Sequence, residues 1–345
     1  MSRLYDLASL TKTLVTAPLA LKHLDFSRDY SSELGLEGSY ILRELLSHTA
    51  GLPPWLPFSP GLRVSDQLRQ LASVDVGSNA LLKFGSRGVV SYSDVSFRLV
   101  CELLELKTGK KIFENAINEY GADSVLHHPW VVTDEDDLPV VLPDGPDKET
   151  WDIASSDPYP SRGRHLPHDA NARAGMRGHA GFAVTVRGFE NTLRQWASGG
   201  WPQLQAVDVA ANSEGLIYGF GLHHAQPRYA HLLSKIGSDV DGVVVLEQRP
   251  EHEQGELAER TARLNSTSTS TLTHTQAPNA SGWWMHTGFA GCVVLVRPFP
   301  REKCLVIGIL ATRRGPGGEL LDKDELVDRR LAILADWCGT QTQTN

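Results

Sequence analysis

A serine and a lysine stand three residues apart near the start of the chain, in the sequence Ser9-Leu10-Thr11-Lys12. Residues three apart on a helix lie on one face, so the Lys12 amine would be within reach of the Ser9 hydroxyl. A lysine kept partly neutral by desolvation or by a second cation can take the serine proton, and a helix N-terminus favours the negative charge that develops. The pair indicates nucleophilic catalysis, although S-x-x-K alone also fits an ordinary capped surface helix.

Further short motifs follow along the chain: Tyr5–Thr13 around the pair, then Leu45–Pro53 (LLSHTAGLP), Tyr92-Ser93-Asp94, His168–Ala172, Gly178–Phe182, Tyr218–Gly221, His286–Gly291 and Leu310–Arg314. In this order and spacing the set resembles the serine β-lactamase and penicillin-binding superfamily, in particular the branch of class C β-lactamases, related esterases and D-amino-acid peptidases. The resemblance covers nearly the whole chain. It implies a serine hydrolase that needs no cofactor and no metal.

The resemblance also implies roles for individual residues. Ser9 matches the nucleophile that becomes acylated, and Lys12 matches the lysine that helps to remove its proton. Tyr92 matches a phenol that passes protons between the serine, the leaving group and water; an ordinary tyrosine pKa near 10 makes it a base only if cations such as Lys12 lower that pKa.

A second group of matching residues concerns substrate binding. In the family, a Lys/His-Thr-Gly triplet on a strand lines the cleft, and His286, Thr287 and Gly288 match it here. The backbone N–H groups of Ser9 and Phe289 correspond to the oxyanion hole that holds the charge of the tetrahedral intermediate.

Two positions depart from the β-lactamase pattern. Asp94 stands where asparagine is usual, and a carboxylate close to Lys12 would hold the lysine charged, which makes it a poorer base and leaves more of the proton transfer to Tyr92. His286 stands where lysine is usual, and an imidazole supplies only part of a positive charge near neutral pH. Both changes weaken the case for efficient β-lactam hydrolysis. If His286 and Tyr92 act through their protonation states, turnover should titrate between about pH 6 and 8.

A third departure lies at the N-terminus, where the family usually has two strands, and often an export signal, ahead of the nucleophile. Only eight residues precede Ser9 here. Without those strands the sheet that contains Val293 to Ala311 would expose an edge, and an exposed edge invites pairing with a second copy of the chain.

The expected fold is α/β (α+β): an antiparallel sheet flanked by helices, with a mainly helical domain inserted. Apolar periodicity predicts a helix over Leu7–Leu24, kinked by Pro18, and another over Phe97–Lys107. Short apolar runs predict strands, and a closing helix follows: Val243–Leu246, Cys292–Val296, Cys304–Ala311 and the helix Leu326–Trp337. The expected domains are a discontinuous sheet domain, 1–35 plus 210–345, and a helical, loop-rich domain, 36–209. Residues 251–281 are expected to form an exposed polar insertion within the sheet domain, and whether this insertion is ordered or disordered is left open.

Composition limits the partners. The chain has 345 residues, 41% hydrophobic and 21% charged, which is typical of a globular protein. A net charge of −8 argues against nucleic acid, and no apolar run is long enough to span a bilayer. Lacking a signal-peptide pattern, the chain as written is expected in the cytoplasm; a start further upstream would make it periplasmic or secreted. Four widely spaced cysteines are expected to be reduced.

Several alternatives stay open from the sequence. His48 fits a residue that orders its loop better than a catalyst. The histidines at 165, 168 and 179 with Asp169 could bind a metal, but the resemblance already accounts for two of them as loop motifs. Trp283 and Trp284 would line the cleft or pack as a pair. A catalytically silent relative that binds a ligand or partner is the alternative to a hydrolase acting on a small-molecule or peptide acyl substrate.

Overall fold

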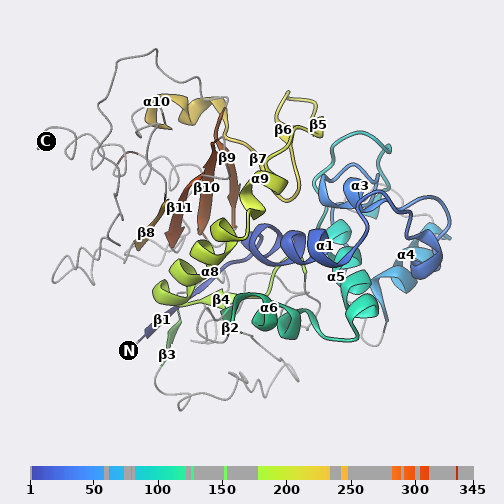
Figure 1. Ribbon diagram of the computed structural model, residues 1–345. Helices are drawn as coiled ribbons and strands as arrows, with labels where there is room; N and C mark the ends of the chain where they lie inside the picture. Colours follow the sequence, from blue (N-terminus) through green and yellow to red (C-terminus); the bar gives the residue numbers. More distant parts are fainter. Residues whose placement is uncertain are drawn as a thin grey trace, which may run out of the picture.

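The protein's structure is a computed structural model. It describes residues 2–57, 62–73, 79, 82–121, 126–127, 151–153, 178–233, 242–247, 282–288, 291–299, 304–310 and 332. Within these ranges a large sheet stands beside a group of helices, with a small second sheet near the N-terminus (Figure 1).

The large sheet has seven strands in the order β5-β6-β7-β9-β10-β11-β8. Their bounds are Ala210–Ala211 (β5), Ile217–Tyr218 (β6), His223–His224 (β7), Gly242–Glu247 (β8), Trp284–Thr287 (β9), Val293–Pro298 (β10) and Cys304–Leu310 (β11). All neighbours pair antiparallel except β11 and β8, which are parallel. The expected antiparallel sheet is therefore confirmed, with one parallel pair added at its end.

Both faces of the sheet are buried, which is why its strands read as continuous apolar runs. Along β10, Val294 and Val296 join the main core, whereas Val293 and Leu295 join a smaller cluster on the other face. Side chains alternate between faces along a strand, so one run supplies both cores. The predicted strands Val243–Leu246, Cys292–Val296 and Cys304–Ala311 correspond to β8, β10 and β11.

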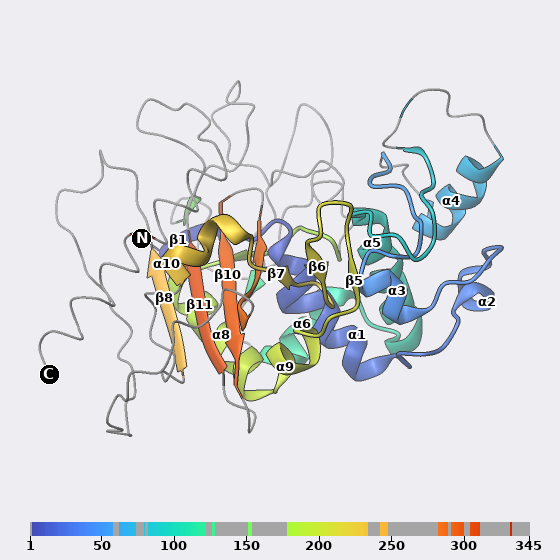
Figure 2. The ribbon, with the colours of Figure 1, turned by 90° about the horizontal axis from the view of Figure 1, so that it is seen from above.

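A helix covers each face of the sheet (Figures 1 and 2). Helix α8 (Val186–Ser198) lies on the main-core face against β8 and β11, and α10 (Ala230–Leu233) contributes to the cluster on the other face. Gly308 allows the approach of α8, since a Cβ there would lie 2.3 Å from Leu193. The domain boundaries expected from the sequence stay a prediction. Those boundaries assign α8 to the helical domain, although α8 packs on the large sheet.

The remaining helices gather on one side of the sheet (Figure 1). Their bounds are Ala17–His23 (α1), Ser31–Leu34 (α2), Leu42–Leu46 (α3), Val64–Ala72 (α4), Asp94–Thr108 (α5), Ile112–Tyr120 (α6) and Trp201–Gln205 (α9). Helix α5 contains the predicted Phe97–Lys107, begins at the capping side chain of Ser93 and ends at Gly109 in the left-handed region.

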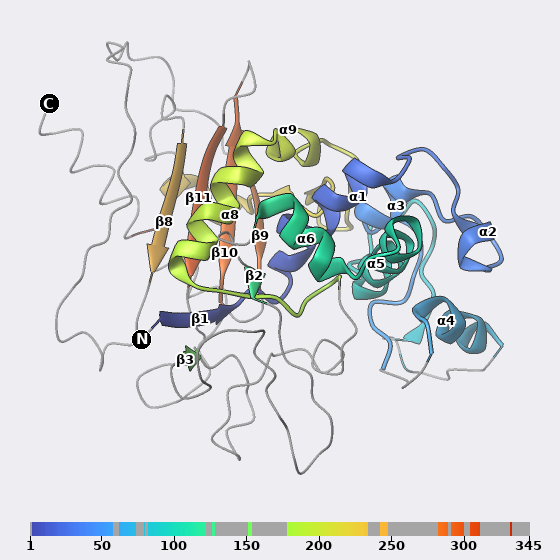
Figure 3. The ribbon, with the colours of Figure 1, turned by 60° about the horizontal axis from the view of Figure 1, so that its bottom comes forward.

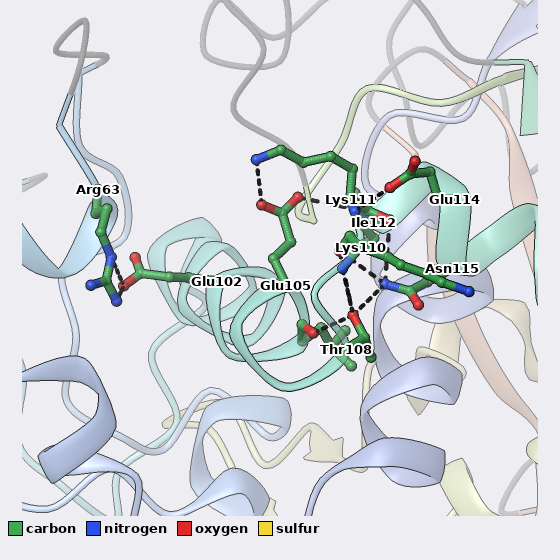
Figure 4. A network of polar contacts seen from close by, with 10 residues as sticks. Arg63, Glu102, Glu105, Thr108, Lys110, Lys111, Ile112, Glu114 and Asn115 are labelled. Atoms are coloured by element: carbon green, nitrogen blue, oxygen red, sulfur yellow. Dashed lines mark hydrogen bonds and ion pairs between the residues drawn. The ribbon is translucent and has the colours of Figure 1, made fainter.

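Two carboxylates of α5 bind residues at the starts of the neighbouring helices α4 and α6 (Figure 4). Glu105 accepts hydrogen bonds from Lys111 Nζ at 2.8 Å and from the backbone N–H of Ile112 at 3.2 Å, which satisfies a free donor at the start of α6. Glu102 binds Arg63 and Ser65 at the start of α4. Helix α5 is thus the frame of the helical half, and its own first residue lies in the candidate site.

The predicted N-terminal helix is confirmed, but its first turns differ from an α-helix. Residues Lys12–Thr16 form a π-helical segment that continues into α1. Because Pro18 has no N–H, the carbonyls of the preceding turn lose a donor. Gln205 donates to the Thr13 carbonyl and Tyr120 donates to the Leu14 carbonyl, so Pro18 is accommodated without leaving buried acceptors unpaired.

A small sheet, in the order β2-β4-β1-β3, contains the strand that leads to Ser9 (Figure 3). Its strands are Ser2–Asp6 (β1), Leu126–His127 (β2), Trp151–Ile153 (β3) and Ala183–Val184 (β4). Two expectations concern this region. The residues before Ser9 form β1, which pairs with β3 and β4 in the small sheet and is not part of the large one. Among the described residues β8 pairs with β11 and is an edge strand of the large sheet, so the expected open edge stays a prediction. The dimer stays a prediction.

Other expectations can be compared only in part. Cys101, Cys292 and Cys304 are buried, whereas Cys338, the insertion 251–281 and nearly all of Leu326–Trp337 lie outside the described residues. No helix in the described ranges has both the length and the apolar character that crossing a membrane requires.

Candidate active site

Ser9 lies in a tight turn between β1 and the first helix. The preceding residue, Ala8, has φ 44°, a left-handed conformation that costs a non-glycine residue about 1–2 kcal/mol. Two hydrogen bonds hold the turn: Ala8 N–H donates to Asp6 Oδ1 at 2.7 Å, and Leu7 N–H donates to the Phe182 carbonyl at 2.9 Å. The position of the serine is therefore imposed by its surroundings.

Lys12 is completely buried beside this serine. Its Nζ donates hydrogen bonds to Ser9 Oγ at 3.0 Å and to the His179 carbonyl at 2.8 Å, and it forms an ion pair with Asp94 Oδ1 at 2.7 Å. Burial alone would lower the pKa of Lys12, but the charge of Asp94 and the phenol of Tyr92 outweigh it and raise that pKa above the usual value. Two accepting oxygens and one carboxylate around Nζ fit an ammonium ion. The direction of this shift agrees with the effect expected of Asp94, which stays a prediction.

Tyr92 reaches the same hydroxyl from the opposite half of the site. Its own hydroxyl donates to Ser9 Oγ at 3.0 Å, and Lys12 Nζ lies 5.1 Å from the ring centroid. The residue is 38% exposed, so part of the ring faces solvent. The packing around the phenol raises the pKa of Tyr92, Lys12 lowers it in part, and Asp94 raises it again. The condition that the sequence set for Tyr92 as a base, a pKa lowered by nearby cations, is therefore not met in the free site.

The ring of His48 packs against the ring of Tyr92. The two rings stack with centroids 4.5 Å apart and an interplanar angle of 29°. His48 Nδ1 accepts a hydrogen bond from the Ser93 backbone N–H at 3.0 Å, which places the ring proton on Nε2. Burial, and then the charge of Lys12, lower the pKa of His48 to about 3. The neutral ring orders its loop, as the sequence indicated, and also fixes the backbone that carries Tyr92 and Asp94.

Five rings form a closed circuit along one wall of the site. His48 contacts Tyr92, Tyr92 contacts His286 at 6.3 Å, His286 contacts His223 at 6.1 Å, His223 contacts Tyr218 at 5.5 Å, and Tyr218 returns to His48 at 6.0 Å (distances between ring centroids). We call this set the ring wall. It brings His286 of β9 to the phenol that touches the nucleophile.

The end of β9 lies against the segment before Ser9. A Cβ on Gly288 would be 2.4 Å from the Leu7 carbonyl oxygen, so only glycine permits this approach. Gly288 N–H donates to the Cys292 carbonyl at 2.7 Å, which turns the chain from β9 into β10. Gly288 therefore adjoins the nucleophile turn, and Thr287 is the last residue of β9 before it, whereas Phe289 lies outside the described residues.

The backbone N–H of Ser9 has no hydrogen-bond acceptor within the described part of the chain. It is thus available to a developing oxyanion.

The structure brings Ser9, Lys12, Tyr92 and Asp94 into direct contact. Sequence reasoning missed two participants, the carbonyl of His179 and the ring of His223. The Gly178–Phe182 motif pointed to the first, but a backbone acceptor leaves no signal in residue type. Within the described ranges, no three His, Cys, Asp or Glu side chains are placed to hold a metal ion; His165, His168 and Asp169 lie outside those ranges.

Comparison with known proteins decides the family. A family profile for beta-lactamases matches residues 2–332. This chain belongs to the beta-lactamase family. The match spans almost the whole chain, so both the sheet and the helices around the site are parts of the beta-lactamase fold. No curated protein sequence matches this beta-lactamase-family chain.

Solved structures agree on the fold. The chain is similar to SurE with D-Leu (15% identity, TM-score 0.52, covering 98% of this chain and 64% of that one). It is also similar to a beta-lactamase/D-alanine carboxypeptidase from Yersinia pestis (14%, 0.52, covering 96% and 84%). A third similar structure is a D-amino acid amidase from Ochrobactrum anthropi SV3 (12%, 0.51, covering 98% and 85%). At these identities the likeness concerns the beta-lactamase fold alone, and the chain spans less than two thirds of the length of SurE.

Proposed function

We propose that this beta-lactamase-family protein is a serine hydrolase that forms an acyl-enzyme at Ser9 on an ester, amide or peptide carbonyl. One observation carries the proposal: Ser9 Oγ receives hydrogen bonds from both Lys12 Nζ and the Tyr92 hydroxyl, each at 3.0 Å. A serine placed between a buried ammonium ion and a phenol has partners for both charge and proton transfer.

The proton route follows from the charges. As the bond from Ser9 Oγ to the substrate carbonyl forms, the serine proton must leave. Lys12 is already an ammonium ion, so Tyr92 in its anionic form accepts the proton, with Lys12 stabilising the phenolate. Tyr92 then protonates the leaving group as its bond to the carbonyl carbon breaks, and water reverses the sequence to release the acid.

This route sets the pH dependence of the reaction. Because the pKa of Tyr92 is raised, the reactive phenolate is scarce at neutral pH and acylation should accelerate as pH rises.

The oxyanion would form next to the Ser9 backbone N–H. We assign this donor, together with the backbone of Phe289, to the oxyanion hole by the family resemblance. The unused N–H of Ser9 supports the first half of that assignment.

The similar structures suggest substrates with which to begin. One is a D-amino acid amidase and another a beta-lactamase/D-alanine carboxypeptidase. Amides of amino acids in both configurations, an activated ester and a penicillin therefore cover the carbonyl types proposed.

Mass spectrometry tests the acyl-enzyme directly. Incubation with a fluorescent penicillin and with activated esters should add the mass of one acyl group to the peptide that contains Ser9, and Ser9→Ala should abolish the adduct. Thr11→Ala is the matched control, since it removes a buried hydroxyl from the same turn without touching Ser9. Absence of an adduct with every acyl donor would overturn the proposal.

One observation favours the second candidate, a silent protein that only binds. Asp94 holds Lys12 charged, so the lysine cannot serve as the base in the free protein. For a silent protein, peptide or penicillin binding should survive Ser9→Ala, and the wild type should show neither adduct nor turnover.

A further inference from the structure

Only one of the two carboxylate oxygens of Asp94 takes part in an ion pair among the described residues. Its Oδ1 pairs with Lys12 at 2.7 Å and is fully buried, yet the side chain keeps 20% exposure. The accessible part therefore lies on the remaining atoms, of which Oδ2 is the only polar one. Within the described part of the chain, Oδ2 has no hydrogen-bond or ion-pair partner.

The position of this carboxylate is fixed by its backbone. Asp94 N–H donates to the Pro54 carbonyl at 2.8 Å, and Ser93 Oγ donates to the Pro53 carbonyl at 2.6 Å. His48 accepts from the Ser93 N–H. A charged group held in this way loses little freedom when it binds a partner.

Asp94 is also close to the reacting atom. One ion pair, to Lys12, and one hydrogen bond, from Lys12 to Ser9 Oγ, connect its Oδ1 to the nucleophile. A substrate carbonyl carbon must sit against Ser9 Oγ for attack, so the substituents of its α-carbon lie about one side-chain length from Asp94.

We propose that Asp94 Oδ2 binds an ammonium group on the α-carbon of the acyl donor, so that the substrates are amides or esters of amino acids with a free amine. This inference rests on the proposed acyl transfer at Ser9. A carboxylate has lone pairs on both oxygens, so Asp94 can hold Lys12 through Oδ1 and a substrate ammonium through Oδ2. Hydrogen bonds between charged groups are about twice as strong as neutral ones.

The same charge discriminates against acidic donors. Asp94 neutralises Lys12, which in the described part of the chain is the one lysine or arginine that contacts Ser9 or Tyr92. An acyl donor with a carboxylate next to its scissile carbonyl would meet Oδ2 as a like charge. Asp94 should therefore strengthen the binding of acyl donors that carry an amine and weaken the binding of donors that carry a carboxylate.

Three substrates that differ only at the amine test this. They are the p-nitroanilides of alanine, N-acetylalanine and propionic acid, each chiral one in both configurations. Wild-type kcat/KM for the better alanine isomer should exceed that for the other two acyl groups by about tenfold or more at pH 7. Asp94→Asn should reduce this ratio to near one. Asp66→Asn, which removes the same charge from a surface residue paired with Arg69, should leave it unchanged.

Binding supplies a readout that does not need turnover. In Ser9→Ala, alaninamide should bind about tenfold more tightly than propionamide by calorimetry, and adding Asp94→Asn should remove the difference. Equal kcat/KM values for the three anilides, or a preference that persists in Asp94→Asn, overturn the inference and leave the hydrolase intact. Amine-dependent binding through Asp94 without any adduct supports the inference while overturning the acyl transfer. If the kinetic preference and the difference in binding are both absent, the role of Asp94 is overturned.

Discussion

The ammonium group of Lys12 and the carboxylate of Asp94 lie 2.7 Å apart next to the Ser9 hydroxyl, with the lysine fully buried and the aspartate partly exposed. The pair keeps a proton on Lys12 and gives the site no net charge from these two residues. In the mechanism that we propose, Tyr92 therefore acts as the base, and the second carboxylate oxygen of Asp94 is left for the substrate.

Replacing the aspartate should shift the pH dependence of acylation. Asp94 raises the pKa of both Lys12 and Tyr92, so in Asp94→Asn both groups lose their protons at lower pH. With an uncharged donor such as p-nitrophenyl acetate, the rising limb of kcat/KM against pH should move to lower pH. An unchanged limb in Asp94→Asn would show that neither group supplies the base.

Breaking the pair from the other side should cost stability. Lys12→Met leaves the Asp94 carboxylate without its counterion, and we expect the free energy of unfolding in urea to fall by about 2–3 kcal/mol, less than for a fully buried pair because Asp94 is partly exposed. The double variant Lys12→Met/Asp94→Asn should recover at least half of the loss. Additive losses in the double variant would contradict this account.

His48 should make the protein sensitive to acid. Its folded pKa of about 3 lies below the unfolded value near 6.5, so the unfolded chain binds the extra proton. The stabilisation of the folded state by neutral His48 is complete above pH 6.5. It is lost as pH falls towards 3, by about 1.4 kcal/mol of unfolding free energy per pH unit.

The matched variant is His48→Asn. Asparagine tolerates the φ of 60° at this position and its side-chain oxygen can accept from Ser93 N–H, but it does not titrate. Urea unfolding between pH 7.5 and 5 should therefore show a shallower slope in His48→Asn than in the wild type. Parallel slopes would exclude His48 as the group responsible.

Tyr92→Phe separates the hydroxyl from the ring. The phenylalanine keeps the stack on His48, so the melting temperature should change little. Loss of the hydroxyl that contacts Ser9 should slow acylation by about 100-fold or more. Wild-type acylation rates in a stable Tyr92→Phe protein would remove Tyr92 from the proton route.

The turn around Pro18 gives a stability prediction away from the chemistry. Tyr120→Phe leaves the buried Leu14 carbonyl without its donor and should cost about 1–3 kcal/mol in urea unfolding. In Pro18→Ala the new N–H can donate to Leu14, so Tyr120→Phe should cost less in that background. Equal costs in both backgrounds would mean that the two donors are not interchangeable.

Local patterns in the sequence were sufficient for the long buried strands of the large sheet and for α5. The uninterrupted apolar run of Cys304–Leu310 predicts a strand buried on both faces, and the periodic helix that ends at Gly109 predicts α5. Strand β1 was not predicted, because five residues of mixed polarity acquire a strand conformation only through pairing with β3 and β4.

The candidate site divides in the same way. The local spacing of Ser9 and Lys12 indicated the first two candidate residues, and the family resemblance added Tyr92 and the Asp94 substitution. The tertiary structure decided what those residues do to one another: Asp94 raises the pKa of Lys12, and His48 packs against the ring of Tyr92. Electrostatic energies and pKa values depend on distance and burial, which are set when segments far apart in the chain pack together, so no reading of the sequence alone supplies them.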